Sequence, residues 1–182
     1  DYGTTLLLKT IIDKFTLNSY TYSTSLSSAT PVSTDEEITK SDGWKSSKQW
    51  KKASDKMAFY AYYAGTSSAT FSLSGDNPTL SYTVADDVAN QQDLLVAKNV
   101  GVTGVNTNTP ISLSFNHALT AVQFGIGSTM AKGTITKIEL RGIKNSGTYN
   151  YSNDTWTSQS GDKTYTLESP AHTARILHLS SF

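Results

Sequence analysis

The sequence of 182 residues contains no cysteine, only two arginines and four glutamates, and no net formal charge. The absence of cysteine excludes disulfides, thiolate metal ligands and a cysteine nucleophile. The neutral balance argues against a nucleic-acid-binding protein, because such proteins usually carry a clear basic excess. No stretch of about 18 apolar residues is present, so the sequence predicts no transmembrane helix.

The residues that are abundant favour strands and turns. Serine and threonine together account for 51 residues and tyrosine for 10, while charged residues make up only 16%. Thr, Tyr, Val and Phe favour strands, whereas Ser, Asn, Gly and Asp favour turns. The 37% hydrophobic content argues against disorder. This composition is typical of an all-β domain on a cell surface or outside the cell.

Short segments in which apolar and polar residues alternate recur along the chain, as in half-buried strands. We expect seven to nine strands, drawn from residues 4–12, 15–22, 57–64, 71–73, 80–84, 93–97, 111–126, 135–140 and 165–167. Residues 23–42 are predicted to be a long surface loop, and residues 145–147 a turn. Turn signals spaced by about 8 to 15 residues are typical of a β-sandwich or barrel.

The histidines and aspartates do not form a recognisable catalytic or metal-binding pattern. His117 could pair with one of many serines, but no G-x-S-x-G motif is present, and we interpret it as a structural histidine near a strand bend. Asp86, Asp87 and Asp93 lack the spacing of a calcium loop and are interpreted as turn-capping residues. None of the four glutamates is an obvious acid in an apolar pocket. We therefore predict no metal, no cofactor and no enzymatic activity.

The segment of residues 44–56 combines five lysines with Trp44 and Trp50. Charge and stacking could bind an anionic sugar or a nucleic acid here. The interpretation that we favour is a hydrophilic connection whose tryptophan rings cover one end of the core, because the chain as a whole is neutral.

Four sequence blocks follow one another in a fixed order. They are Met57–Tyr63 (M-A-F-Y-A-Y-Y), Leu80–Val84 with Gln92–Ala97, Ile111–Phe124, and Ile138–Gly142 with Gly147–Tyr149 and Trp156. Taken together, over roughly residues 10–168, they resemble the N-terminal part of fimbrillin-like proteins of Bacteroidales, the major and minor fimbrillin superfamily.

This resemblance implies a transthyretin-like Greek-key β-sandwich of about seven strands. The sandwich would occupy residues 1–168, and residues 169–182 would be a tail or the remnant of a missing C-terminal domain. In the family, such a domain is the first of two in a pilin or tip subunit, made as a lipoprotein precursor and exported to the outer membrane.

The resemblance also implies an assembly mechanism. A protease that cuts after arginine removes an N-terminal strand, and the groove left behind accepts a donor strand from the next subunit. The two arginines here, Arg141 and Arg175, do not precede the sandwich. Cleavage before Asp1, cleavage at Lys9 or Lys14, and no processing therefore remain as alternatives.

The predicted function is that of a non-enzymatic structural or adhesive subunit of a bacterial surface fimbria. Its expected partners are other pilin subunits, with host or bacterial surface glycans or proteins as further candidates. The residues expected to form the strand or groove for assembly are Leu6, Leu7, Leu8, Ile11 and Ile12. The alternative is a cell-surface carbohydrate-binding module, which would use exposed tryptophans as stacking platforms: Trp44, Trp50 and Trp156.

Overall fold

The structure is a computed structural model that describes residues 12–49, 55–104, 110–125, 133–168 and 173–179. Within these residues, regular structure consists of strands and two single-turn 3-10 helices, η1 (Leu26–Ser28) and η2 (Val88–Asn90). The strands are β1 (Lys14–Tyr22), β2 (Thr30–Thr39), β3 (Lys56–Tyr63), β4 (Ala69–Ser74), β5 (Asn77–Thr83), β6 (Leu95–Val102), β7 (Asn116–His117), β8 (Thr120–Gly125), β9 (Lys137–Ile143), β10 (Ser146–Asn150), β11 (Thr155–Ser160), β12 (Lys163–Glu168) and β13 (Thr173–His178). The prediction of an all-β sandwich is confirmed.

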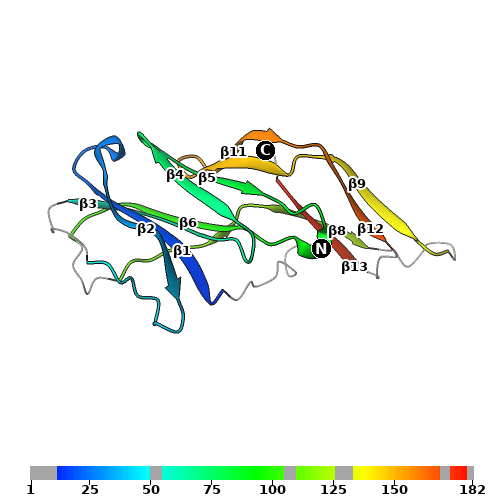
Figure 1. The fold of residues 1–182 in the computed structure, drawn as a ribbon, viewed down its shortest axis with the longest axis horizontal. Helices are drawn as coiled ribbons and strands as arrows, with labels where there is room; N and C mark the ends of the chain where they lie inside the picture. Colours follow the sequence, from blue (N-terminus) through cyan, green and yellow to red (C-terminus); the bar gives the residue numbers. More distant parts are fainter. Residues whose placement is uncertain (1–11, 50–54, 105–109, 126–132, 169–172, 180–182) are drawn as a thin grey trace.

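Two antiparallel sheets form the main sandwich, at the left and centre of Figure 1. One has the strand order β2-β1-β3-β6-β7 and the other β11-β10-β5-β4. Aromatic residues fill the space between them. Tyr60 on β3 packs edge-on against Tyr151 at 5.3 Å between ring centroids, and the Tyr151 hydroxyl donates a hydrogen bond to the Ala61 carbonyl at 3.2 Å. The two sheets are thus joined by both apolar and polar contacts.

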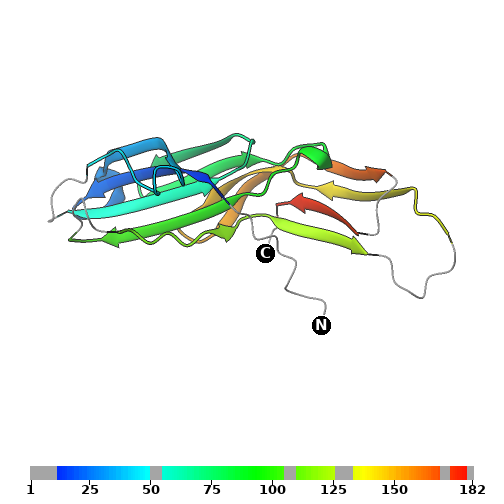
Figure 2. The ribbon, with the colours of Figure 1, turned by 90° about the horizontal axis from the view of Figure 1, so that it is seen from below.

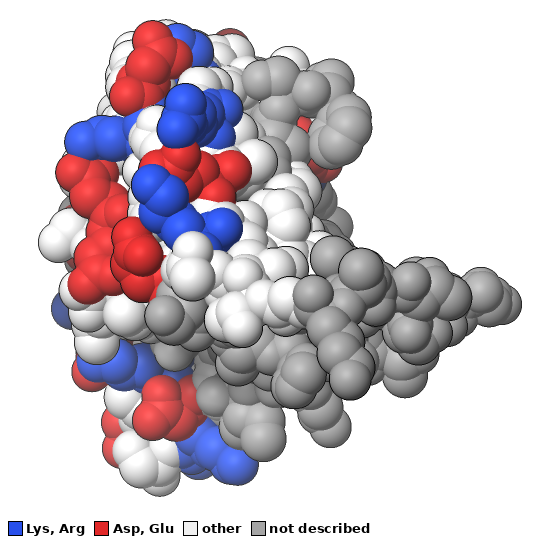
Figure 3. Space-filling view, turned by 90° about the vertical axis from the view of Figure 1, so that its right-hand side faces the viewer, with Lys and Arg blue, Asp and Glu red and all other residues white. Residues whose placement is uncertain are grey.

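A narrower extension continues the sandwich at the other end of the molecule (Figures 1 and 2). It consists of two two-stranded antiparallel sheets, β12-β9 and β13-β8. The hairpin from Lys137 to Glu168 belongs to both parts, since β10 and β11 pair in the main sandwich and β9 and β12 pair in the extension. Charged side chains of both signs gather along one side of this end of the molecule (Figure 3).

Asn145 lies at the joint between the two parts. It is buried, and its side-chain amide donates to the Val84 carbonyl at 3.3 Å and to Asp86 Oδ1 at 3.1 Å. Gly161, opposite, has a φ of 73°, and a Cβ built there would lie 2.1 Å from Asn145 Oδ1. Glycine is therefore required at this position both by the backbone conformation and by the close approach of Asn145.

Three predictions of local structure are wrong. Residues 23–42 are not all loop, because they include the ten-residue strand β2. Its polar composition concealed it, since only Ser33 and Ile38 are buried on this edge strand. Residues 145–147 are not a turn: β10 begins at Ser146, and the turn lies at residues 151–154. Residues 111–115 alternate in burial as predicted but pair with no described strand.

The end of the chain carries a strand that its sequence did not indicate. β13 lies within residues 169–182, which were expected to be a tail or remnant, and it pairs in register with β8 from Thr173 opposite Gly125 to His178 opposite Thr120. Ile176 is fully buried in the core. Part of the expected tail therefore belongs to the folded extension.

Candidate functional site

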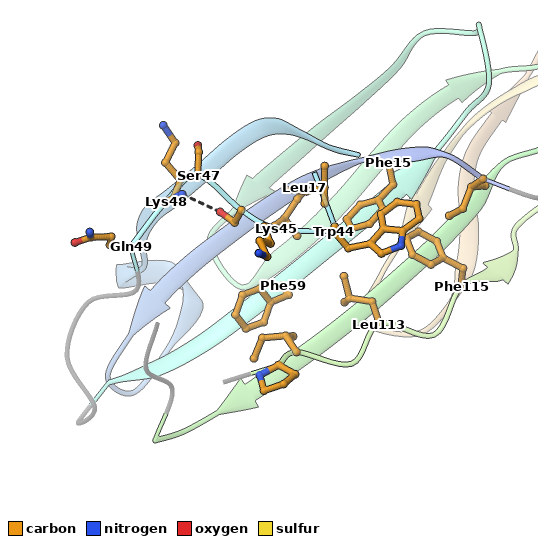
Figure 4. A pocket seen from close by; sticks show the side chains of 16 residues that line it. Phe15, Leu17, Trp44, Lys45, Ser47, Lys48, Gln49, Phe59, Leu113 and Phe115 are labelled. Atoms are coloured by element: carbon orange, nitrogen blue, oxygen red, sulfur yellow. Dashed lines mark hydrogen bonds between the residues drawn. The ribbon is translucent and has the colours of Figure 1, made fainter. Parts of the chain in front are cut away.

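A groove of about 840 Å³ lies on the face of the five-stranded sheet that points away from the second sheet (Figure 4). We call it the outer groove. Residues of β1, β2 and β3 supply its apolar floor, and the two from β1 share this face because side chains two apart on a strand point the same way. The floor consists of Phe15, Leu17, Ile38 and Phe59. Residues 43–49 form one wall of the groove, and residues 110–115 form the other.

The first wall is held in place by the turn that follows β2. Gly43 and Trp44 both have left-handed backbone conformations, with φ values of 71° and 58°. The Trp44 ring stacks on Phe15 with 5.7 Å between ring centroids, and the residue as a whole remains 42% exposed. An exposed tryptophan face therefore forms part of the mouth of the groove.

Glu36 fastens the same wall through its carboxylate. It accepts hydrogen bonds from the Ser47 backbone N–H at 2.7 Å and from the Ser46 hydroxyl at 2.8 Å. Burial alone would raise the pKa of Glu36, but hydrogen bonds from Ser33, Ser46 and Ser47 outweigh it and lower that pKa. The ionised carboxylate thus helps to order the polar rim of the groove.

The second wall, residues 110–115, has the alternation of a strand without a strand partner among the described residues. Leu113 and Phe115 are half-buried and line the groove, whereas Ser112 and Ser114 are exposed. The Asn99 side chain donates to the Ser112 carbonyl at 3.0 Å and attaches this segment to β6. The wall therefore combines apolar side chains with main-chain groups that no described strand pairs.

The structure places the predicted assembly residues only in part. Ile12 lines the outer groove, two residues before the start of β1. Leu6, Leu7, Leu8 and Ile11 lie outside the described residues. Their role remains a prediction.

The predicted glycan-stacking tryptophans do not come together at one site. Trp44 borders the outer groove, and Trp50 lies outside the described residues. Trp156 lies in a separate cleft of about 550 Å³, where its indole N–H donates to the Ala118 carbonyl at 2.8 Å and its ring packs edge-on against Tyr149. Trp156 is thus tied to the core, while Ile12 and Trp44, assigned from sequence to different functions, border the same groove.

Sequence reasoning missed several groove residues. Phe15 and Phe59 were expected on strands and Phe115 in an alternating segment, but alternation does not indicate which sheet face is covered by a second sheet. Phe15 and Phe115 meet in the groove at 5.2 Å between ring centroids. The signal available in the sequence was an apolar set on both faces of residues 57–64, which implies a second covered face.

Other polar residues have structural surroundings. His117 Nδ1 lies 2.5 Å from Asp93 Oδ2. Asp87 accepts a hydrogen bond from the Ala89 N–H at 2.9 Å and caps η2, so its predicted turn-capping role is confirmed. In the part of the chain that the structure describes, no group of three or more His, Asp or Glu residues is placed to hold a metal ion. No helix there is long and apolar enough to cross a membrane.

Comparison with known proteins identifies a family to which the chain is similar. A family model described as fimbrillin-like matches residues 10–181, which includes every described strand. No curated protein and no solved structure matches the chain.

Proposed function

Because the chain belongs to the fimbrillin-like family, whose members are fimbrial surface proteins, we propose that it is a non-enzymatic structural or adhesive subunit of a bacterial fimbria. In this proposal it joins its neighbours by donor-strand complementation at the outer groove, and the fimbria is attached to the outer membrane. The observation that carries the proposal is the groove itself, which has an apolar floor beside an extended wall with no described strand partner.

Strand addition suits this geometry for two reasons. An extended segment laid beside residues 110–115 would form main-chain hydrogen bonds with that wall. Its alternate side chains would enter the groove and cover Phe15, Leu113 and Phe115, which are only half-buried. A donor from a neighbouring subunit makes a head-to-tail contact, and such contacts build filaments.

We further propose that residues 6–11, which lead directly into Ile12, cover the groove before assembly. Their apolar side chains, Leu6, Leu7, Leu8 and Ile11, match its apolar lining. Of the two candidate cleavage positions, Lys9 is favoured over Lys14. Lys14 is already paired with Thr39 in the β1–β2 ladder, and its ammonium group contacts Glu37 at 2.9 Å.

Assembly of two variants tests the groove. Leu113→Asp places a charge inside it, whereas Ser114→Asp places the same charge on the exposed side of the same segment. We expect immunogold electron microscopy of producing cells to show filaments with Ser114→Asp and with the unaltered chain, and none with Leu113→Asp. Normal filaments of a folded Leu113→Asp protein would refute the outer groove as the assembly site. N-terminal sequencing of filaments tests processing: cleavage after Lys9 should leave Thr10 as the first residue, and filament subunits that keep residues 6–9 would refute this cleavage.

A carbohydrate-binding surface module is the second candidate, and the exposure of Trp44 favours it. Its ring lies at the mouth of the groove, beside the exposed Lys45 and Lys48. This function predicts saturable glycan binding that Trp44→Ala abolishes, by a chain that does not self-assemble. Filaments carrying gold label along their length would instead support the fimbrial subunit.

A further inference from the structure

The four outer edges of the main sandwich differ in how they are protected against pairing with another chain. Native sheets protect edges with proline, charged residues, bulges or very short strands. β2 carries Pro31, the acidic residues 35–37 and two register shifts in its pairing with β1. β7 has only two residues, and β11 has a register shift and a left-handed residue, Ser158, with a φ of 52°.

The fourth edge, β4, has none of these features. Its six residues pair with β5 from Ala69 opposite Tyr82 to Ser74 opposite Asn77 without a register shift. It contains no proline, and residues 65–75 contain no charged side chain. Among the described strands, β4 is therefore the one edge of the main sandwich that has none of these protections.

The hydrogen-bonding groups that β4 presents follow from its neighbours. Pro78 has no N–H, and its carbonyl accepts from the Tyr151 N–H, so Pro78 directs its main-chain oxygen toward β10. Leu73 lies opposite Pro78, and in an antiparallel pair such a residue directs its own N–H and C=O toward the free edge. The same holds for Phe71, two residues earlier, and for Ala69, whose carbonyl accepts from the Tyr62 hydroxyl at 3.3 Å.

The side chains of β4 divide cleanly between its two faces. Phe71 and Leu73 point toward the core and are half-buried, whereas Thr70, Ser72 and Ser74 are exposed. Phe71 stacks with Tyr60 at 5.4 Å between ring centroids, so the core-facing side of β4 is continuous with the main core. An added strand would cover apolar surface on one face and meet only hydroxyl groups on the other.

We infer that β4 pairs with the β4 of a second copy of this chain, antiparallel and about a two-fold axis at Ser72. Phe71 then lies opposite Leu73 of the second copy, and the two residues exchange main-chain hydrogen bonds on each side of the axis. Ser72 lies opposite its own counterpart and Thr70 opposite Ser74, pairings that bring no like charges together. The two four-stranded sheets become one sheet of eight strands.

A second copy is favoured over an unrelated partner because the strand is complementary to itself in this register. A two-fold contact is closed, so it joins only two copies and leaves neither copy of β4 free to pair again. It is thus a lateral contact, and it goes beyond the head-to-tail contact of the proposed function. It does not depend on the outer groove.

Charge substitution at Ser72 tests this pairing by sedimentation equilibrium. The measurements use the 182-residue chain carrying Leu113→Asp, so that association through the outer groove does not contribute. We expect this chain to dimerise. Ser72→Lys, which places two lysines face to face, should raise the dissociation constant at least about tenfold, as should Ser72→Glu. An equimolar mixture of the two variants should restore dimerisation.

Ser81→Lys is the matched control. Ser81 is exposed on the same face of the same sheet, but it lies on β5, which is paired on both sides. We expect it to leave the dissociation constant unchanged. The pairing is refuted by a parent chain that stays monomeric at its highest soluble concentration, by equal effects of Ser72→Lys and Ser81→Lys, or by a mixture that fails to restore the dimer.

Discussion

The five-stranded sheet is buried on both faces, but the two faces are covered in different ways. On β3, Tyr60 and Tyr62 point inward to the second sheet, while Met57 and Phe59 point outward. The inward face is covered by strands that are hydrogen-bonded into a sheet. The outward face is covered by segments 40–49 and 110–115, which leave the outer groove between them.

This difference indicates that the inward face contributes mainly to stability, whereas the outward face is suited to exchanging one covering strand for another. Antiparallel sheets commonly leave one face in water, so a second apolar face requires a cover. A cover made of sheet is fixed by many hydrogen bonds at once. A cover that includes an extended segment with no described strand partner can accept another strand without disrupting a ladder of the described sheets.

The largest change in stability is expected at alkaline pH, and it arises from tyrosines in the core that the inward face helps to form. Burial raises the pKa of Tyr60, Tyr149 and Tyr151, and raises that of Tyr165 to about 12. Because these folded values exceed the unfolded value of about 10, the contribution to stability is complete below pH 10 and is lost as the pH rises through the folded values. We expect the free energy of unfolding, measured in urea, to fall steeply above pH 10.

Tyr60, in the main core, and Phe15, at the outer groove, allow the two faces to be compared directly. Tyr60→Phe removes one of these titrating groups and should make the fall above pH 10 less steep, whereas Phe15→Tyr adds a phenol at the outer groove and should leave it unchanged. A pH profile that Tyr60→Phe does not alter would contradict the assignment of alkaline unfolding to the inward face.

Truncation of leucines on the two faces should give the next largest effect. Leu80 is fully buried on β5, and Leu80→Ala should lower the free energy of unfolding by about 2–5 kcal/mol. Leu113 is half-buried at the outer groove, so Leu113→Ala should cost less than about 1.5 kcal/mol. Urea titration of both variants measures the difference. Equal losses would mean that the outer face is packed as a second core.

The smallest effect is expected at Ser19, which lies on β1 opposite Phe59. Its hydroxyl is buried, and within the described residues it has no hydrogen-bond partner. Because an unsatisfied buried polar group is costly, Ser19→Ala should leave stability unchanged or raise it by up to about 1 kcal/mol. Thermal unfolding measures this change, and a clear loss of stability would indicate a partner for the hydroxyl.

Alternating sequence predicted the strands with one clear apolar face. Residues 15–22, 57–64 and 80–84 correspond closely to β1, β3 and β5. β2 escaped prediction because an edge strand protected by acidic residues and Pro31 has the composition of a loop. Local sequence thus identified these three strands, but it did not indicate which of their faces would be covered.

The candidate site was less predictable, because it depends on contacts between distant segments. Ile12 and Trp44 are 32 residues apart in the sequence and border the same groove because β1 pairs with β2. Residues 110–115 have the pattern of a strand, but only the sheet order reveals that they lack a described strand partner. The unprotected edge of β4 likewise becomes evident only once the outermost strands are known.

The hairpin shared by the main sandwich and the extension has a mechanical consequence. A pull applied to β9 and β12 is transmitted along the same two chain segments into β10 and β11. Tension directed along strands loads all the rungs of a ladder together in shear, rather than opening them one by one. The buried Asn145, which ties this hairpin to Val84 and Asp86, lies where the load passes from one part to the other.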